Sequence, residues 1–132
     1  MDRSVQAFLD GNHFAVMTTL KDDGAPHVVM VGIGLVDGRL WSSGTQTRVR
    51  TGHLRKDDRA TLCVLSENKW RWLALETRVN ILEGPDAPEQ NLALYRVITG
   101  KPPDDVDEYL QAMVAEQRLI FEFEILRAYG SY

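Results

Sequence analysis

Cysteine is nearly absent from this sequence of 132 residues. The one cysteine, Cys63, cannot form a disulfide within the chain, so we expect a protein of a reducing compartment, by default the cytoplasm. No apolar stretch reaches the roughly 18 residues that a transmembrane helix needs, and the first residues lack the apolar core of a signal peptide, so we expect no membrane insertion. Basic residues are also in the minority. The formal net charge of −4 argues against a dedicated nucleic-acid binder.

The sequence also lacks the signatures of common side-chain catalysis. His13, His27 and His53 are far apart and have no cysteine at metal-ligand spacing, so we expect no metal site. Neither a G-x-S-x-G nucleophile motif nor a G-x-x-x-x-G-K-[ST] phosphate loop occurs. Cys63 stands among apolar residues of an expected strand, which predicts a buried thiol. If the protein is an enzyme, a cofactor is expected to supply the chemistry.

The composition is that of one globular domain, which we place at residues 1–132: 44% of the residues are hydrophobic and 26% are charged. Runs rich in β-branched and aromatic residues alternate with turn signals, of which Asp37-Gly38 is the strongest hairpin signal. Gly32 and Gly34 share a strand face, where they let the strand bend or let something flat approach its backbone. We predict strands at 13–20, 27–36, 39–44, 60–66, 70–82 and 118–130, and helices at 3–10, 86–99 and 105–117. This inventory indicates a mainly β fold with minor α content, a small six-stranded antiparallel barrel with short flanking helices.

Residues 45–57 form a polar and basic segment, which we interpret as a loop that enters a short helix. Arg48 and Arg50 stand where that helix begins, and a helix N-terminus offers free N–H groups and the positive end of its dipole. Two guanidinium groups and the Thr51 hydroxyl at this point favour a phosphate site. The alternative is a solvated surface loop whose charges pair with the acidic residues 57–58.

Four motifs occur in a fixed order along nearly the whole chain. They are P-H-V-V-M-V at 26–31, R-x-R-T-x-x-L-R-x-D at 48–57, W-x-W-x-x-x-E at 70–76 and the pair Tyr129-Gly130. Together they resemble the split β-barrel flavin and deazaflavin oxidoreductases, relatives of pyridoxamine 5′-phosphate oxidase. The resemblance is greatest to the branch that uses the deazaflavin coenzyme F420. It implies an FMN-binding-like split barrel and a homodimer with cofactor sites at the subunit interface.

The resemblance also implies a set of cofactor-binding residues. Arg48 and Arg50 stand where the family grips the cofactor phosphate, although lysine is usual at the second position; Thr51 follows them, and His53 replaces an asparagine. The residues expected to lie along the ring system are His27, Val28, Val29, Met30, Ser43, Gly44 and Thr45. Trp70 matches an aromatic residue contributed by the partner chain, and Trp72 matches its neighbour. From the spacing alone, Trp70 and Trp72 are expected to share a strand face, which predicts that they pack in the core or at an interface.

The leading functional hypothesis is an F420-dependent oxidoreductase that transfers a hydride from the reduced deazaflavin to a conjugated organic substrate. One alternative is an FMN-dependent oxidase or flavin reductase of the same fold. Another is a non-catalytic carrier of a cofactor or of a haem-type ligand. His27 is the only side chain that we nominate as a proton donor, and no catalytic residue is assigned. We expect the helical pair within residues 86–117 to cover one end of the barrel and to help shape the substrate pocket.

Overall fold

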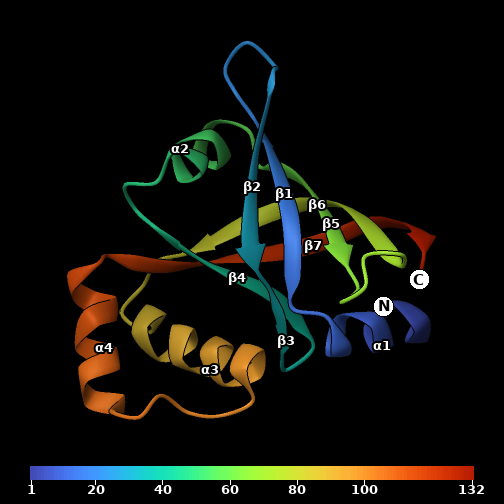
Figure 1. Ribbon diagram of the computed structural model, residues 1–132. Coiled ribbons are helices and arrows are strands. Elements are labelled where there is room, and N and C mark those ends of the chain that lie inside the picture. Colours follow the sequence, from blue (N-terminus) through green and yellow to red (C-terminus); the bar gives the residue numbers. More distant parts are fainter.

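The computed structural model describes residues 1–132 as one curled antiparallel sheet with four helices around it (Figure 1). The helices are α1 (Arg3–Gly11), α2 (Val49–Lys56), α3 (Ala87–Thr99) and α4 (Val106–Ala115). The strands are β1 (Phe14–Leu20), β2 (Pro26–Gly32), β3 (Gly34–Val36), β4 (Arg39–Thr45), β5 (Arg59–Leu65), β6 (Trp72–Leu82) and β7 (Arg118–Ser131). The predicted mainly β fold and all the predicted helices are confirmed. None of the four helices has the combination of length and apolar character needed to cross a bilayer.

The sheet has seven strands, one more than predicted, in the order β2-β1-β5-β6-β7-β4-β3. The expected strand at 27–36 is divided at Ile33, whose side chain is fully buried and whose N–H donates to the carbonyl of His13. Residues before Ile33 pair with β1, and residues after it pair with β4. The prediction of one continuous strand at 27–36 was therefore wrong, because a continuous hydrophobic run does not show where the chain changes its partner strand.

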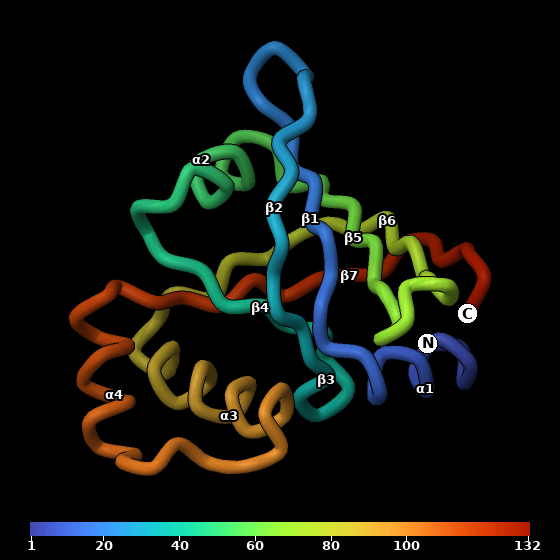
Figure 2. The backbone as a smooth tube through the Cα atoms, viewed as in Figure 1, coloured from blue at the N-terminus to red at the C-terminus, as the bar shows by residue number.

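The division at Ile33 closes the sheet into a half-barrel. β2 and β3 are adjacent in the chain, yet they occupy opposite ends of the strand order. The sheet must therefore curl until its two edges meet. Ser42 in β4 donates a hydrogen bond of 2.7 Å to the carbonyl of Gly32, and Figure 2 shows β2 crossing over β4 at this seam.

The Asp37-Gly38 hairpin turn is also as predicted. Asp37 has a φ of 51° and Gly38 a φ of 78°, so both central residues are left-handed, as a two-residue type I′ turn requires. Such a turn matches the twist of its flanking strands and fixes the pairing of β3 with β4. It thereby sets which residues of β4 face the barrel interior.

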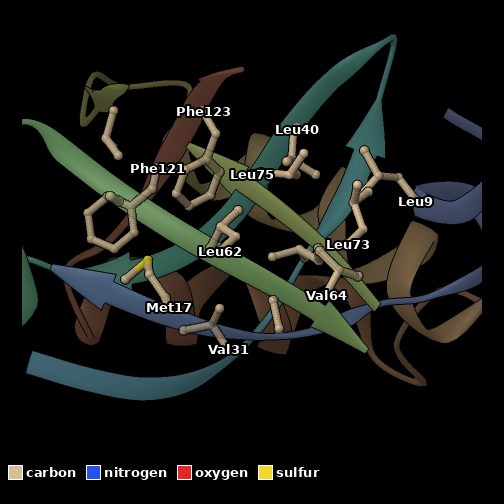
Figure 3. Packing of buried hydrophobic residues seen from close by; sticks show 14 of the residues in the cluster. Leu9, Met17, Val31, Leu40, Leu62, Val64, Leu73, Leu75, Phe121 and Phe123 are labelled. Carbon is tan, nitrogen blue, oxygen red and sulfur yellow. The ribbon is translucent and has the colours of Figure 1, made fainter. Parts of the chain in front are cut away.

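The concave face of the sheet holds the main hydrophobic core. Alternate residues of β1, β5, β6 and β7 point inward and meet α1, as Figure 3 shows for a subset that includes Leu9, Met17, Leu62, Leu75 and Phe121. Burial of each such side chain contributes about 1.5–3 kcal/mol of transfer free energy. Val31 of β2 and Leu40 of β4 belong to this core. The core therefore supports the two strands that carry the predicted cofactor residues at 27–30 and 43–45.

Helix α3 covers the outside of the seam. It packs against β3, β4 and β7, and α4 packs beside it (Figure 1). A Cβ on Gly34 would lie 2.8 Å from Val97 Cγ1, and one on Gly32 would lie 3.3 Å from Ile98 Cδ1. Gly32 and Gly34 therefore lie at the bend of the strand, and their lack of a side chain lets helix α3 pack closely against the strand backbone. The helical pair was expected to cover one end of the barrel; the structure places α3 against β3, β4 and β7 at the seam.

Two burial predictions were wrong. Cys63 is only half-buried, because it lies on the face of β5 opposite the core. Trp70 and Trp72 do not share a strand face: β6 begins at Trp72, and Trp70 lies in the preceding turn with 83% of its surface exposed. Trp72 is itself at the sheet's outer face, edge-on to Tyr129 with ring centroids 6.3 Å apart. Neither tryptophan belongs to the core.

Candidate cofactor site

A cavity of about 280 Å³ lies at the seam of the half-barrel. Its walls come from the end of β2, the middle of β4, the start of α2, the start of β7 and one face of α3. Five of the predicted cofactor residues line it: Val29, Met30, Ser43, Arg48 and Arg50. Residues from three separate parts of the sequence are thus brought to one place.

Arg50 is the most unusual residue of this cavity. Its surface is only 8% exposed, yet it forms no salt bridge. One guanidinium nitrogen, Nη2, lies 3.3 Å from the carbonyl of Ser43, while the buried Nε has no hydrogen-bond partner. Burial, and next the nearby charges of Arg48 and Arg118, lower the pKa of Arg50 from its ordinary value. A buried cation beside two others, without a carboxylate, is arranged for an anion that comes from outside the chain.

The position of Arg50 depends on a glycine in β4. A Cβ on Gly44 would lie 2.5 Å from Cε2 of Phe121, so only glycine leaves room for the Phe121 ring. The guanidinium carbon of Arg50 lies 5.9 Å from the centroid of that ring, at the outer limit of a cation–π contact. Gly44 therefore supports the site from below and does not itself line the cavity.

Thr45 and Thr51 shape the loop between β4 and α2. The Thr51 hydroxyl donates a hydrogen bond of 2.6 Å to the carbonyl of Thr45, and both residues are buried. The prediction that the Thr51 hydroxyl takes part in the phosphate site differs from this arrangement, because its proton is used within the loop. Arg48, at the N-cap position of α2, makes no side-chain capping bond, and within the first turn the Thr51 N–H donates to the carbonyl of Arg48 at 3.1 Å.

Asp57 and Asp58 do not neutralise the two cavity arginines. Asp57 pairs with Arg59 at 2.7 Å, and Asp58 pairs with Arg78 at 2.6 Å. Hydrogen bonds from Arg59 lower the pKa of Asp57 to about 2. The alternative in which the charges of the basic segment pair with Asp57 and Asp58 was therefore wrong.

The other basic residues of α2 do have acidic partners. Arg55 pairs with Glu83, and Lys56 lies 3.0 Å from Asp22. Uncompensated positive charge is thus concentrated at the start of α2, at Arg48 and Arg50, which fits an anion site there.

The edge of β2 offers free backbone groups beside the cavity. Ile33 N–H points to β1, whereas the carbonyl of Gly32 points to Ser42 on the other side. Peptide groups alternate along a strand, so those of Val28 and Met30 also point away from β1. Since β2 is an edge strand, no neighbouring strand uses these groups. A planar ligand with carbonyl and N–H groups along its edge could pair with them.

Besides Gly44, Thr45 and Thr51, four predicted residues do not line the cavity. Val28 is 60% exposed on the outer face of β2, and Trp70 and Trp72 lie at the β5–β6 turn. That turn lies beside α1, where the guanidinium carbon of Arg71 is 5.3 Å from the centroid of the Phe8 ring, on the far side of the molecule from α2 (Figure 1). Within one chain, the tryptophans are therefore not brought to the cavity.

His27 is the fourth of these residues. Its Nδ1 is buried without a partner, and its ring lies edge-on to His53 with centroids 5.1 Å apart. His53 Nδ1 in turn lies 3.0 Å from the Thr19 hydroxyl. The pair joins α2 to the β1–β2 hairpin, next to the anion site and not inside it.

Comparison with known proteins agrees with this geometry. The family model described as pyridoxamine 5′-phosphate oxidase matches residues 1–132. The chain belongs to the pyridoxamine 5′-phosphate oxidase family. A curated relative, the F420H(2)-dependent biliverdin reductase of Mycobacterium tuberculosis (strain CDC 1551 / Oshkosh), is 30% identical over 131 residues, which are 95% of this chain and 84% of the relative. The predicted family resemblance is thereby confirmed.

Solved structures show the same fold as this member of the pyridoxamine 5′-phosphate oxidase family. A conserved hypothetical protein from Mycobacterium tuberculosis has a TM-score of 0.85 at 19% identity, over 99% of this chain and 84% of its own. A structure named F420 reductase has a TM-score of 0.74 at 17% identity, over 98% of both chains. The predicted split-barrel fold is confirmed by these matches.

The cavity has the chemistry that a phosphate-bearing cofactor of this family requires. The orphaned Nε of Arg50 and the exposed guanidinium of Arg48 can each donate to phosphate oxygens. Arg118 is a third cation that the sequence did not indicate. It lines the cavity because β7 pairs with β4 so that Arg118 faces Thr45. No local signal could have found Arg118, since that pairing joins distant parts of the chain.

Proposed function

We propose that this protein is an F420-dependent oxidoreductase that reduces a conjugated organic substrate. The observation that carries the proposal is the buried Arg50, unpaired and flanked by Arg48 and Arg118. A phosphate at this point would put the adjoining ring system along the free edge of β2. The name of the relative from Mycobacterium tuberculosis, an F420H(2)-dependent biliverdin reductase, supports the choice of cofactor and makes biliverdin the first substrate to try.

The chain's own residues would bind, orient and shield the reactants. Arg48 and Arg50 hold the phosphate, while the peptide groups of Val28 and Met30 seat the ring edge. Ser43 lines the ring pocket, where Gly44 and Thr45 shape its base. When bound, the reduced deazaflavin supplies a hydride, that is two electrons and one proton, and is left oxidised by two electrons. The substrate would take that hydride at an electrophilic atom, and it would take a proton from water or from His27, which lies beside the anion site.

FMN is the second candidate cofactor, and one observation favours it. F420 has an acidic oligoglutamate tail beyond its phosphate, and Arg55 and Lys56 are the further basic residues of α2 that could attract that tail. Both are already paired, with Glu83 and Asp22. A phosphate without a tail therefore suits the site equally well, and the protein would then be an FMN-dependent oxidase or flavin reductase.

Titration of the apo-protein with F420 and separately with FMN tests the proposal, with fluorescence quenching as the measurement. We expect tight F420 binding, weak FMN binding and loss of affinity in the R48A/R50A double variant. Each charge-assisted hydrogen bond contributes about 1.5–3 kcal/mol, so the double variant should bind at least a hundredfold more weakly. R55A/K56A is the matched control, because it removes the same charge from the same helix at paired positions.

The outcomes of this titration separate the alternatives. Preference for FMN would replace the proposed cofactor and keep the site. Binding of F420 with no turnover of biliverdin or any other conjugated acceptor would indicate a carrier. Unchanged affinity in R48A/R50A would contradict the phosphate assignment, and binding of neither cofactor would contradict the function itself.

We also propose that the active form is a homodimer, formed through the outer face of the sheet. Apolar or small residues at paired positions run across that face in one row: Met30, Val16, Cys63, Ala74 and Tyr129. Side chains at paired positions share a face, and Phe14, Val28, Met30, Trp72 and Tyr129 are all exposed there. An apolar patch of this extent on an isolated chain is typical of an interface.

A partner chain could then place its Trp70 against the cofactor ring, which would explain an exposed tryptophan remote from its own cavity. Light scattering should give a dimer for the wild type and a monomer for V16K, whereas V114K, at an exposed position of α4, should stay dimeric. W70A should bind F420 more weakly than the wild type without dissociating. A monomeric wild type would contradict this arrangement. We place the enzyme in the cytoplasm, where a single unpaired cysteine stays reduced.

A further inference from the structure

A second cavity, of about 270 Å³, opens between α3, α4 and the start of β7. It adjoins the cofactor cavity, because Ser43, Leu94, Ile98 and Arg118 line both. We call it the α3–α4 cavity. Its remaining walls include Tyr95, Tyr109 and Met113. A ligand in this cavity would therefore lie next to whatever occupies the seam.

The walls of the α3–α4 cavity are aromatic and aliphatic. The ring centroids of Tyr95 and Tyr109 lie 5.1 Å apart at an interplanar angle of 58°, and Met113, one turn after Tyr109 on α4, is buried. Leu94 and Ile98 complete an apolar surface along α3. Surfaces of this kind accept flat, conjugated rings, because stacking on aromatic rings adds to the burial of apolar area.

The polar groups beneath these walls are already satisfied. Asn91 is only 2% exposed; it accepts a hydrogen bond from Ser43 and donates one of 2.9 Å to the carbonyl of Ala87. The Tyr109 hydroxyl donates to the carbonyl of Asn91 at 3.2 Å, and burial raises the pKa of Tyr109. This hydrogen-bond network holds Asn91 and Tyr109 in place and uses their polar groups, so this part of the cavity favours an apolar ligand group.

Arg118 is the one charged side chain that lines the cavity. It is bound to Glu116 through Nε and Nη2, both of which donate to the same carboxylate oxygen at 3.0 Å and 2.9 Å. Glu116 is itself half exposed to solvent, so this pair is weak and can rearrange. A ligand acid group is the natural additional partner, since Arg48 and Arg50 raise the positive charge nearby.

We propose that the α3–α4 cavity is the substrate site and that it takes the conjugated ring end of an organic acid whose carboxylate pairs with Arg118. The inference rests on the proposed function only in calling the bound acid a substrate. The acidic tail of the cofactor is a less suitable occupant, because a chain of several carboxylates would meet apolar walls and a single cation.

The probe for this site is 2-naphthoate, a flat bicyclic carboxylate, with 2-naphthamide as its uncharged counterpart. Isothermal titration calorimetry of the apo-protein should show submillimolar binding of the acid and at least fivefold weaker binding of the amide. M113W, which fills the cavity from α4, should weaken naphthoate at least tenfold. V114W adds the same side chain at an exposed position of the same helix and should leave the affinity unchanged.

Two further variants locate the probe. Y95A removes one wall from a partly exposed position and should also weaken naphthoate, which keeps the test valid if M113W does not fold. R118Q should reduce the preference for the acid over the amide to less than twofold. Each variant is checked by its thermal unfolding and by its F420 affinity, which M113W and Y95A should leave within threefold of the wild type.

Several results would overturn the substrate site. They are no detectable naphthoate binding to the wild type, binding that M113W and Y95A leave intact, or displacement of naphthoate by saturating F420. A large loss of F420 affinity in M113W would assign the cavity to the cofactor tail instead. Failure of the wild type to bind F420 would contradict the proposed function but not the naphthoate site, so the two failures are distinguishable.

Discussion

Replacement of Arg50 by methionine should stabilise the protein and abolish its anion site at the same time. Arg50 is buried, its Nε has no partner, and its nearest charges are those of Arg48 and Arg118. An unsatisfied buried donor costs about 1–3 kcal/mol. The cation–π contact with Phe121 offsets part of that cost, by about 0.5–1 kcal/mol. Methionine fills part of the same space with a shorter, uncharged side chain and loses the hydrogen bond of 3.3 Å to the carbonyl of Ser43, so R50M should gain up to about 1 kcal/mol of unfolding free energy.

Thermal unfolding with and without an anion measures both effects. A gain of about 1 kcal/mol corresponds to a rise of roughly 3–5 °C in Tm for a domain of this size. A ligand at a hundred times its Kd stabilises the folded wild type by about 2.7 kcal/mol, so F420 should raise the wild-type Tm further. R50M should lose most of that shift, because the lost hydrogen bonds weaken F420 about ten- to a hundredfold. Inorganic phosphate should show the same pattern on a smaller scale.

R55M is the matched control, since Arg55 lies on the same helix but is half exposed and paired with Glu83. It should change neither the Tm without ligand nor the F420 shift by more than a small amount. The reasoning fails if R50M is less stable than the wild type without ligand, because Arg50 would then contribute to folding. It also fails if R50M keeps the full F420 shift, because the anion would then bind elsewhere.

Three further predictions concern the residues around the site. G44A should lower the unfolding free energy by about 1–3 kcal/mol, because the new Cβ clashes with Phe121, and it should weaken the binding of F420. In the control G52A the new Cβ meets open space in α2, so its unfolding free energy, measured in urea, should rise by about 0.5–1 kcal/mol. Because the pKa of Asp57 is lowered to about 2, its stabilising effect is complete above pH 3.8 and disappears as the pH falls toward 2; urea unfolding should show a shallower acid loss in D57N, and an identical slope would contradict this role for the Arg59 pair. Burial raises the pKa of Cys63, so iodoacetamide should alkylate it slowly at pH 7.5 in the wild type and faster in V16K, and equal rates would count against the outer-face dimer.

Local signals in the sequence predicted most of the elements. The period-two alternation of Phe121 and Phe123 with glutamates indicated β7, and the Asp37-Gly38 pair indicated the β3–β4 hairpin. The position of Arg48 and Arg50 at a helix start was also local information, because it depends on a polar segment that follows a strand. Each of these features is decided by residues within a few positions of one another.

Features that depend on strand pairing were missed. The break at Ile33 follows from a change of partner between β1 and β4, which the apolar run from 27 to 36 does not encode. Cys63 is half-buried because β5 turns that side outward, whereas an apolar neighbourhood suggested burial on both faces. Trp70 was placed in a strand because it is aromatic, but the turn that starts at Ser66 ends only at Trp72.

The distinction between a solvated arginine and a buried one decides whether the basic segment is a site, and it is a tertiary property. The sequence contains the same residue type at Arg48, Arg50 and Arg55, but only Arg50 loses its solvent. It does so because Gly44 in β4 has no side chain and leaves room for the Phe121 ring, and because β7 brings that ring to the start of α2. The acids that could have neutralised it are held elsewhere by Arg59 and Arg78. The anion site therefore results from packing that removes water from one cation while the pairing of other charges leaves it without a counter-ion.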